Sequence, residues 1–258
     1  TGEDTLSLHD ALPILTVTGR TLGEEIDAAP PSFKQEVVRK FDNPIYPRGS
    51  IAVLHGNLAP GGAIIKQSAA NEKLMEHEGR AVVFENSEDL ANRIDSPDLD
   101  VTADDILVLK NIGPKGAPGM PEAGYIPIPM KLARAGVKDI VRISDGRMSG
   151  TAFGTIVLHV TPEAAVGGPL AFVNNGDRIR LSVKNREISL LVSEEELAKR
   201  AKENPVIEPT AERGYLKLFL DTVTQADQGV DFDFLRAVKI FCQSASGKLI
   251  VTISSLSS

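Results

Sequence analysis

The chain has 258 residues, of which 42% are hydrophobic and 24% charged, as is typical of a globular protein with a buried core. Its 28 basic and 35 acidic residues give a net charge of −7 with no basic block, so we expect no nucleic-acid partner. No apolar run approaches the roughly 20 residues of a membrane span, and the single cysteine, Cys242, excludes an internal disulfide and favours a reducing cytoplasm.

The apolar residues predict many short strands and a few helices. In chain order we expect strands at 51–54, 63–65, 81–84, 106–109, 139–143 and 156–158, then an apolar run at 170–173 that leads into a half-buried hairpin ending near 192. Helices are expected at 87–94 with Ser87 as N-cap, at 130–135 ended by Gly136, at 193–202 with a capping box of Ser193 and Glu196, and at 214–224.

Before residue 51 the chain is polar and is interrupted by Pro30-Pro31, so we expect folding to begin in earnest at the first strand. No regular βαβ repeat is visible. The pattern therefore predicts a β-rich α/β fold, a barrel or sandwich with helices on its outside, in one domain from about residue 48 to 235.

Two irregular loops carry the residues that suggest chemistry. One follows the strand at 139–143 and contains three glycines together with Asp145, Arg147, Ser149 and Thr151. The other follows the strand at 106–109, is rich in Gly and Pro, and ends at Glu122. If the two strands are neighbours, the loops share one edge of the sheet, where ligand sites are usually built. A carboxylate beside hydroxyl groups suits a hard cation such as Mg²⁺.

Other familiar motifs do not fit. A nucleophile elbow needs glycine two residues on either side of the serine, but Arg147 and Thr151 occupy those positions around Ser149. The glycines at 113, 116 and 119 lack dinucleotide-binding spacing, and phosphate binding by this loop is only weakly suggested. The histidines, His9, His55, His77 and His159, have no metal-ligand spacing.

Three ordered motifs resemble the C-terminal part of the dihydroxy-acid and sugar-acid dehydratases: residues 56–62 (GNLAPGG), 113–122 (GPKGAPGMPE) and 144–151 (SDGRMSGT). The resemblance spans about residues 15–235 and implies a swivelling-type β-barrel flanked by helices. Residues 151–159 (TAFGTIVLH) and 162–165 (PEAA) look more like the aldonate branch than the branched-chain amino-acid enzyme.

The resemblance implies a hydro-lyase that removes water from a 2,3-dihydroxy carboxylate to give a 2-keto acid, with Mg²⁺ and an iron–sulfur cluster as cofactors. Carried over by position, Ser149 matches the family's alkoxide base and Glu122 the Mg²⁺ ligand from this half. Thr151 matches a hydroxyl that contacts the substrate. We assign Asp145 and Arg147 to loop support.

Nothing in the sequence corresponds to the family's N-terminal domain, which supplies the cluster cysteines and the remaining Mg²⁺ ligands. We therefore expect a fragment that is inactive alone, whose full-length form is a homo-oligomer. We divide it into an N-terminal extension (1–14), the dehydratase C-terminal barrel (15–237) and a tail (238–258); the two ends depart from the family pattern. The alternatives are a non-catalytic regulatory barrel and a barrel that binds another hydroxylated small molecule.

Overall fold

The computed structural model describes residues 11–30, 37–45, 49–150, 152–235, 240–245 and 248–253. The chain divides into two compact units, residues 1–47 and 48–258. The first unit contains helix α2 (Leu22–Ala28), which begins with a reciprocal capping box of Thr21 and Glu24. Sequence pattern alone predicts no element here, because the helix is short and buries none of its residues. The Thr-x-x-Glu spacing is the signal that would have found it.

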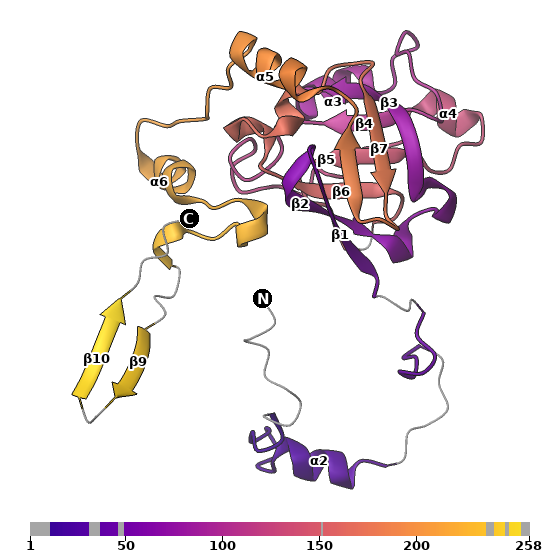
Figure 1. The fold of residues 1–258 in the computed structure, drawn as a ribbon. Helices are drawn as coiled ribbons and strands as arrows, with labels where there is room; N and C mark the ends of the chain where they lie inside the picture. The colour runs from indigo at the N-terminus through magenta and orange to yellow at the C-terminus, as the bar shows by residue number, and fades with distance from the viewer. Residues whose placement is uncertain are drawn as a thin grey trace. The chain divides into compact units, whose positions relative to one another are not determined.

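Within the described part of the second unit, eight strands form a closed barrel in the order β1-β2-β6-β5-β4-β3-β7-β8 (Figure 1). Their bounds are β1 (Ile51–Gly56), β2 (Ala59–Lys66), β3 (Glu76–Phe84), β4 (Ile106–Leu109), β5 (Val141–Ser144), β6 (Ile156–Thr161), β7 (Arg178–Ser182) and β8 (Glu187–Leu190). His55 of β1 pairs with Glu187 of β8 and closes the barrel. The predicted β-rich α/β barrel is confirmed.

Strands β3, β4, β5 and β6 run parallel to one another. Helix α3 (Ser87–Arg93) connects β3 to β4, and α4 (Met130–Arg134) connects β4 to β5. These are two consecutive βαβ units, so the expectation of no such repeat is wrong. The long irregular segments on either side of each short helix hide the repeat in the sequence.

The parallel strands are buried on both faces, which explains their continuous apolar runs. In β4, Ile106 and Val108 point into the barrel core, whereas Leu107 and Leu109 belong to a second cluster outside the sheet. That outer cluster also contains Leu90 of α3, and Leu132 of α4 packs against it. The helices therefore cover the outer face of the strands from which the two irregular loops emerge.

Two further predictions need correction. Asn86, not Ser87, is the N-cap of α3, since its side chain accepts a hydrogen bond from the Asp89 amide at 2.9 Å. The apolar run at 170–173 is mostly a 3-10 helix, η4 (Pro169–Phe172), because Pro169 cannot donate to a sheet and favours the first turn of a helix.

The predicted hairpin is confirmed as β7 and β8, and Ser193 caps α5 (Glu194–Glu203) as expected. Helix α6 is Gly214–Thr222. The remaining short helices are η1 (Gln67–Ala69), η2 (Glu72–Leu74), η3 (Ala164–Val166), η5 (Ala226–Gln228) and η6 (Asp233–Leu235). Strands β9 (Ile240–Ala245) and β10 (Lys248–Ile253) pair as a separate antiparallel sheet.

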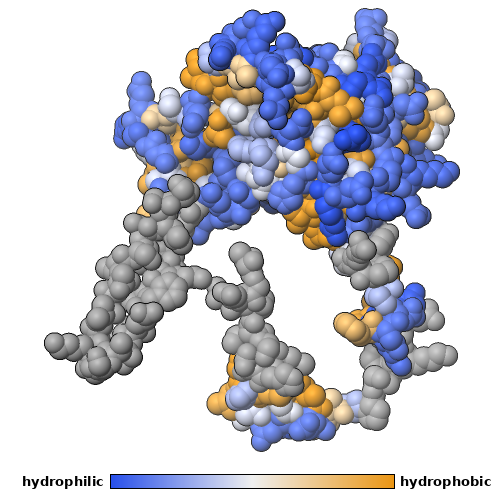
Figure 2. Space-filling model, viewed as in Figure 1, coloured by the Kyte–Doolittle hydropathy of each residue, from blue (hydrophilic) through white to orange (hydrophobic). Residues whose placement is uncertain are grey.

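Hydrophilic residues dominate the visible face of the barrel, with apolar residues in scattered patches between them (Figure 2). Among the described residues, no helix combines the length and the apolar character that crossing a membrane requires.

Strand β1 offers a matched test of the barrel core. Leu54 is fully buried among the core residues, whereas its neighbour Val53 is 48% exposed. Leu54→Ala should lower the free energy of unfolding by about 2–5 kcal/mol, because it leaves a cavity in a packed core. Val53→Ala should lower it by under about 1 kcal/mol. Urea denaturation of both variants measures the difference, and equal effects would contradict the inward orientation of Leu54.

Candidate active site

The two irregular loops leave the same end of two adjacent strands. Strands β4 and β5 pair in parallel, with Leu109 opposite Ser144 at their carboxyl ends. The chain continues from Leu109 into the loop at 110–129 and from Ser144 into the loop at 145–155. The conditional prediction that the loops share one edge of the sheet is thereby confirmed, and this is the edge where parallel sheets usually bind ligands.

Arg147 joins the two loops directly. Its carbonyl accepts a hydrogen bond from the Gly124 amide at 2.7 Å, and its Nε donates to the Met120 carbonyl at 2.5 Å. Its Nη1 lies 3.0 Å from Oε1 of Glu122. A Cβ on Gly124 would lie 2.7 Å from the Arg147 carbonyl, so only glycine permits this approach. Arg147 therefore binds the other loop through both its backbone and its side chain.

Asp145 fixes the start of the second loop from inside the protein. Its side chain is fully buried and accepts backbone hydrogen bonds from Ile112 at 3.0 Å, Asn111 at 3.2 Å and Ala164 at 2.9 Å. Burial raises the pKa of Asp145 to about 6, and the nearby negative charge of Glu163 also raises it, whereas the three amide donors lower it. The predicted loop-support residue thus links three segments of backbone.

A second carboxylate, Asp139, holds the far end of the same loop. It accepts hydrogen bonds from the Thr155 hydroxyl at 2.7 Å and from the Thr155 amide at 2.9 Å. It also pairs with Arg142, whose Nη2 lies 2.8 Å away and whose side chain is almost completely buried. The loop is therefore anchored at both ends, which leaves its middle to present side chains.

Ser149 lies in that middle part and is half-buried. Its carbonyl accepts from the Ala152 amide at 3.1 Å, and Lys66 Nζ donates to the carbonyl of the next residue, Gly150, at 2.7 Å. Thr151 lies outside the described residues. The loop that carries Ser149 therefore contacts Glu122 through Arg147 and is bound by Lys66, a residue that the sequence pattern did not indicate.

The structure also identifies Glu163 as a residue that holds the first loop. Its buried carboxylate accepts hydrogen bonds from the backbone amides of Lys115 and Gly116, each at 2.9 Å. In the sequence, Glu163 belongs to one of the runs that carry the resemblance, but nothing there indicates that it contacts residues 47 and 48 positions earlier. This contact is long-range, and only the folded chain reveals it.

Glu122 is suited to be one ligand of a cation and no more. Its side chain is 50% exposed, so an oxygen ligand is available at the surface, although Arg147 already pairs with it. Where the structure describes the chain, no group of three or more His, Cys, Asp or Glu residues could hold a metal ion. Mg²⁺ prefers octahedral coordination by oxygen, so one carboxylate does not complete a magnesium site.

None of the described histidines belongs to such a group. His9 lies outside the described residues, and His77 contacts the Asp104 carbonyl at 2.9 Å. His159 follows the second loop, and burial together with the positive charge of Arg147 lowers its pKa. The backbone amide of His159 donates to the Gly146 carbonyl at 3.1 Å, and sequence spacing did not indicate this contact with the second loop.

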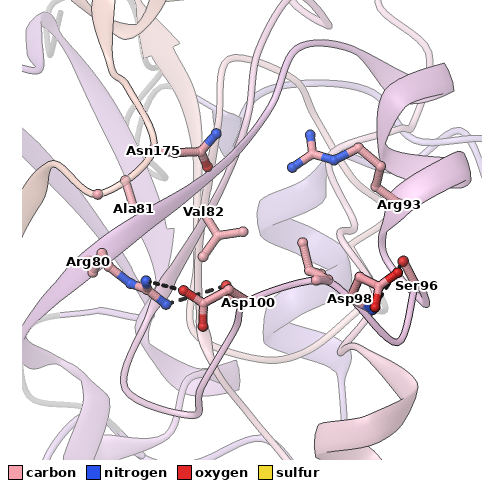
Figure 3. Close-up of a pocket in the computed structure, with 10 residues that line it drawn as sticks. Arg80, Ala81, Val82, Arg93, Ser96, Asp98, Asp100 and Asn175 are labelled. Carbon is pink, nitrogen blue, oxygen red and sulfur yellow. Dashed lines mark hydrogen bonds and ion pairs between the residues drawn. The ribbon is translucent and has the colours of Figure 1, made fainter.

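A hollow of about 320 Å³ lies on another part of the barrel, between β3, the segment after α3 and the turn before β7 (Figure 3). Two guanidinium groups line it, but both are already paired. Arg80 contacts Asp100 at 2.6 Å and Asp105 at 2.9 Å, and Arg93 contacts Asp89 at 2.7 Å. Because Asp105 directly precedes β4, this hollow lies toward the end of β4 opposite to the two loops.

Comparisons with known proteins agree with the motif pattern. The family described as "Dihydroxy-acid/6-phosphogluconate dehydratase C-terminal" matches residues 36–230. An L-arabonate dehydratase of Azospirillum brasilense is 49% identical over 86% of this chain and 39% of its own length. A 6-deoxy-6-sulfo-D-gluconate dehydratase of Pseudomonas putida is 50% identical over 80% of this chain and 36% of its own length. A dihydroxy-acid dehydratase of Dehalococcoides mccartyi (strain CBDB1) is 41% identical over 84% of this chain and 38% of its own length. The chain therefore spans about two fifths of the length of these relatives.

The raised pKa of Asp145 predicts a pH-dependent contribution to stability. Because the folded-state pKa of about 6 lies above the ordinary 3.8, the folded protein holds this proton more tightly than the unfolded chain. The contribution is fully present below about pH 4 and is lost as the pH rises through about 6. An amide at this position does not titrate, so the stability advantage of the wild type over Asp145→Asn should be larger at pH 4 than at pH 7, by up to about 3 kcal/mol.

Urea denaturation across this pH range measures that difference. The exposed Asp98 serves as the control, since Asp98→Asn should show no comparable trend. An advantage of the wild type over Asp145→Asn that grows with pH would contradict the assigned direction.

Proposed function

This chain belongs to the dihydroxy-acid/6-phosphogluconate dehydratase C-terminal family, and on that premise we propose that it is the C-terminal half of a hydro-lyase acting on 2,3-dihydroxy carboxylates. The observation that carries the proposal is the joined pair of loops, in which Arg147 links the Ser149 loop to Glu122 at 3.0 Å. A metal ligand and a proton acceptor are useful to one reaction only when they face the same substrate.

The proposed reaction begins with removal of the proton on C2 of the substrate by Ser149 acting as an alkoxide. The electron pair of the broken C–H bond forms the C2–C3 double bond, and the C3 hydroxyl leaves with the electron pair of the C3–O bond. The departing hydroxide takes up one proton, equivalent to the one that Ser149 removed from C2, so water is released and the Ser149 alkoxide is regenerated. The resulting enol then tautomerises to the 2-keto acid. Serine is a very weak acid, so its ionised form needs nearby positive charge. Lys66 at the Gly150 carbonyl and Arg147 support this role for the loop.

For the cofactors, we propose that Glu122 supplies one Mg²⁺ ligand and that the other ligands come from an N-terminal domain. Bound Mg²⁺ would stabilise negative charge on the substrate carboxylate, as hard cations do. An iron–sulfur cluster needs several thiolates, and this chain has one cysteine. We therefore place the cluster ligands in the N-terminal domain as well, and expect this chain to be inactive by itself.

For the substrate, we propose a sugar acid of the aldonate class. The L-arabonate and 6-deoxy-6-sulfo-D-gluconate dehydratases are 49% and 50% identical to this chain, whereas the dihydroxy-acid dehydratase is 41% identical. Thr151, carried over by position, would contact a substrate hydroxyl. We further propose that the full-length enzyme is a homo-oligomer and that it is cytoplasmic. The single cysteine favours the cytoplasm, where disulfides are rare.

A chimera tests the proposed activity. Residues 36–230 of this chain would replace the matching segment of the Azospirillum brasilense L-arabonate dehydratase, which is 49% identical. We expect the chimera to convert an aldonate to its 2-keto-3-deoxy acid, because the N-terminal part would supply the remaining ligands. The isolated chain should show no turnover. Turnover by the isolated chain would refute the need for a partner, and an inactive, fully folded chimera would refute the proposed activity.

The base is tested in the same chimera. Ser149→Ala should lower kcat by about 10²–10⁴-fold, because loss of a positioned base removes proton abstraction while binding contacts remain. Ser189→Ala on β8 is the control and should leave kcat unchanged. Exchange of the substrate C2 proton with solvent deuterium isolates the first step. Undiminished exchange in Ser149→Ala would assign the base to another residue.

A further inference from the structure

The Gly- and Pro-rich loop at 113–116 wraps around a carboxylate of its own chain. Glu163 is 1% exposed, and both of its oxygens accept the Lys115 amide, at 2.9 and 3.0 Å, while Oε2 also accepts the Gly116 amide. Burying a carboxylate is costly unless hydrogen bonds replace its water. The loop amides supply those bonds, so the loop conformation and the buried charge depend on each other.

Gly113 makes this approach possible. A Cβ at this position would lie 2.6 Å from Oε2 of Glu163 and 2.8 Å from its Cβ. Any larger residue would push the loop away from the carboxylate. Gly113 belongs to the loop whose glycines weakly suggested phosphate binding. Here the anion that the loop binds is the Glu163 carboxylate, because the amides of Lys115 and Gly116 already donate to it.

A third segment holds the carboxylate in turn. Gln225 lies between α6 and η5, and its Nε2 donates to Oε1 of Glu163 at 2.7 Å. In return, the Glu163 backbone amide donates to Oε1 of Gln225 at 2.9 Å. Lys115 of the loop also pairs with Glu208, whose Oε2 lies 3.0 Å from Nζ. We call residues 204–228 the C-terminal arm. Its Glu208 contacts the loop directly at Lys115, and its Gln225 contacts the loop indirectly, through Glu163.

We infer that Glu163 is a positioning residue for the candidate active site and that Gln225 couples its position to the C-terminal arm. The same loop runs from Gly116 to Glu122, where Arg147 binds it. With Glu163 in place, the loop is fixed at its start by Asp145, in its middle by Glu163 and at its end by Arg147. The consequence for catalysis rests on the proposed function of Glu122, whereas the consequence for the loop does not.

Hydrogen exchange on this chain tests the inference without any activity assay. In Glu163→Gln, a side-chain NH₂ group in place of Oε1 would face the NH₂ group of Gln225 and the Lys115 amide, so both bonds to this oxygen are lost and the remaining acceptor is neutral. Exchange at the Lys115 and Gly116 amides should become at least about tenfold faster, with the amides of β4 and β5 unchanged. The double variant Glu163→Gln/Gln225→Glu restores the hydrogen bond between positions 163 and 225, with the charge moved to position 225, and should return exchange to within about threefold of wild type.

Unchanged exchange in Glu163→Gln, or no rescue by the double variant, would overturn the inference. If Glu163→Gln unfolds the barrel, Gln225→Leu gives the same test, because it removes the supporting bond and keeps the carboxylate; loop exchange should again rise while the strands stay protected. Unchanged loop exchange in Gln225→Leu would overturn the coupling to the C-terminal arm.

The chimera tests the consequence for catalysis. Glu163→Gln should lower kcat by about tenfold with little change in KM, since it displaces a loop that acts in the reaction, and the double variant should restore most of it. If the chimera itself shows no turnover, the proposed function fails while the exchange experiment still decides the role of Glu163. If the chimera works and Glu163→Gln keeps full kcat, the positioning role fails.

Discussion

The structure around the site depends on satisfying backbone amides in a loop that is buried. Loops usually run over the surface, because water can then pair with their polar groups. Here Ile112, Gly113 and Pro114 are buried just beyond the carboxyl end of β4, where the chain has left the sheet. Two carboxylates accept hydrogen bonds from the backbone amides of this segment: Asp145 from residues 111 and 112, and Glu163 from residues 115 and 116. Gly113 follows from this arrangement, since a Cβ there would lie 2.6 Å from Oε2 of Glu163.

This arrangement separates the residues that hold the site from those that could react. Asp145, Glu163 and Arg142 are buried and bind backbone groups, and Arg142 also pairs with Asp139. Glu122 and Arg147, in contrast, are 50% and 43% exposed, and an exposed ion pair contributes only about 0–1 kcal/mol. Glu122 could therefore exchange its partner for a cation at little cost, while the buried anchors keep the loop in place. Rigid support beneath exchangeable side chains is what a preorganised site requires.

Much of this could be predicted from the sequence, and the failures have physical causes. Apolar runs located most barrel strands because burial on both faces leaves a continuous signal, and residues such as Ser149 and Glu122 stood out within loops. The adjacency of β4 and β5 could only be stated as a condition, since strand order depends on contacts far apart in the chain. Glu163 and Gln225 were missed for the same reason, being 62 residues apart. Asn86 took the cap expected of Ser87 because adjacent capping residues compete and backbone geometry decides between them.

The internal anion also constrains how the proposed substrate could bind. A Gly-rich loop at the end of a parallel strand commonly offers its amides to a phosphate or a carboxylate. In this protein the amides of residues 111, 112, 115 and 116 are already bound by Asp145 and Glu163. The two buried carboxylates also place negative charge behind the loop, which opposes a second anion there. A substrate carboxylate would therefore need positive charge from side chains such as Lys66 and Arg147 or from a bound cation, which is consistent with the proposed Mg²⁺ ion at Glu122.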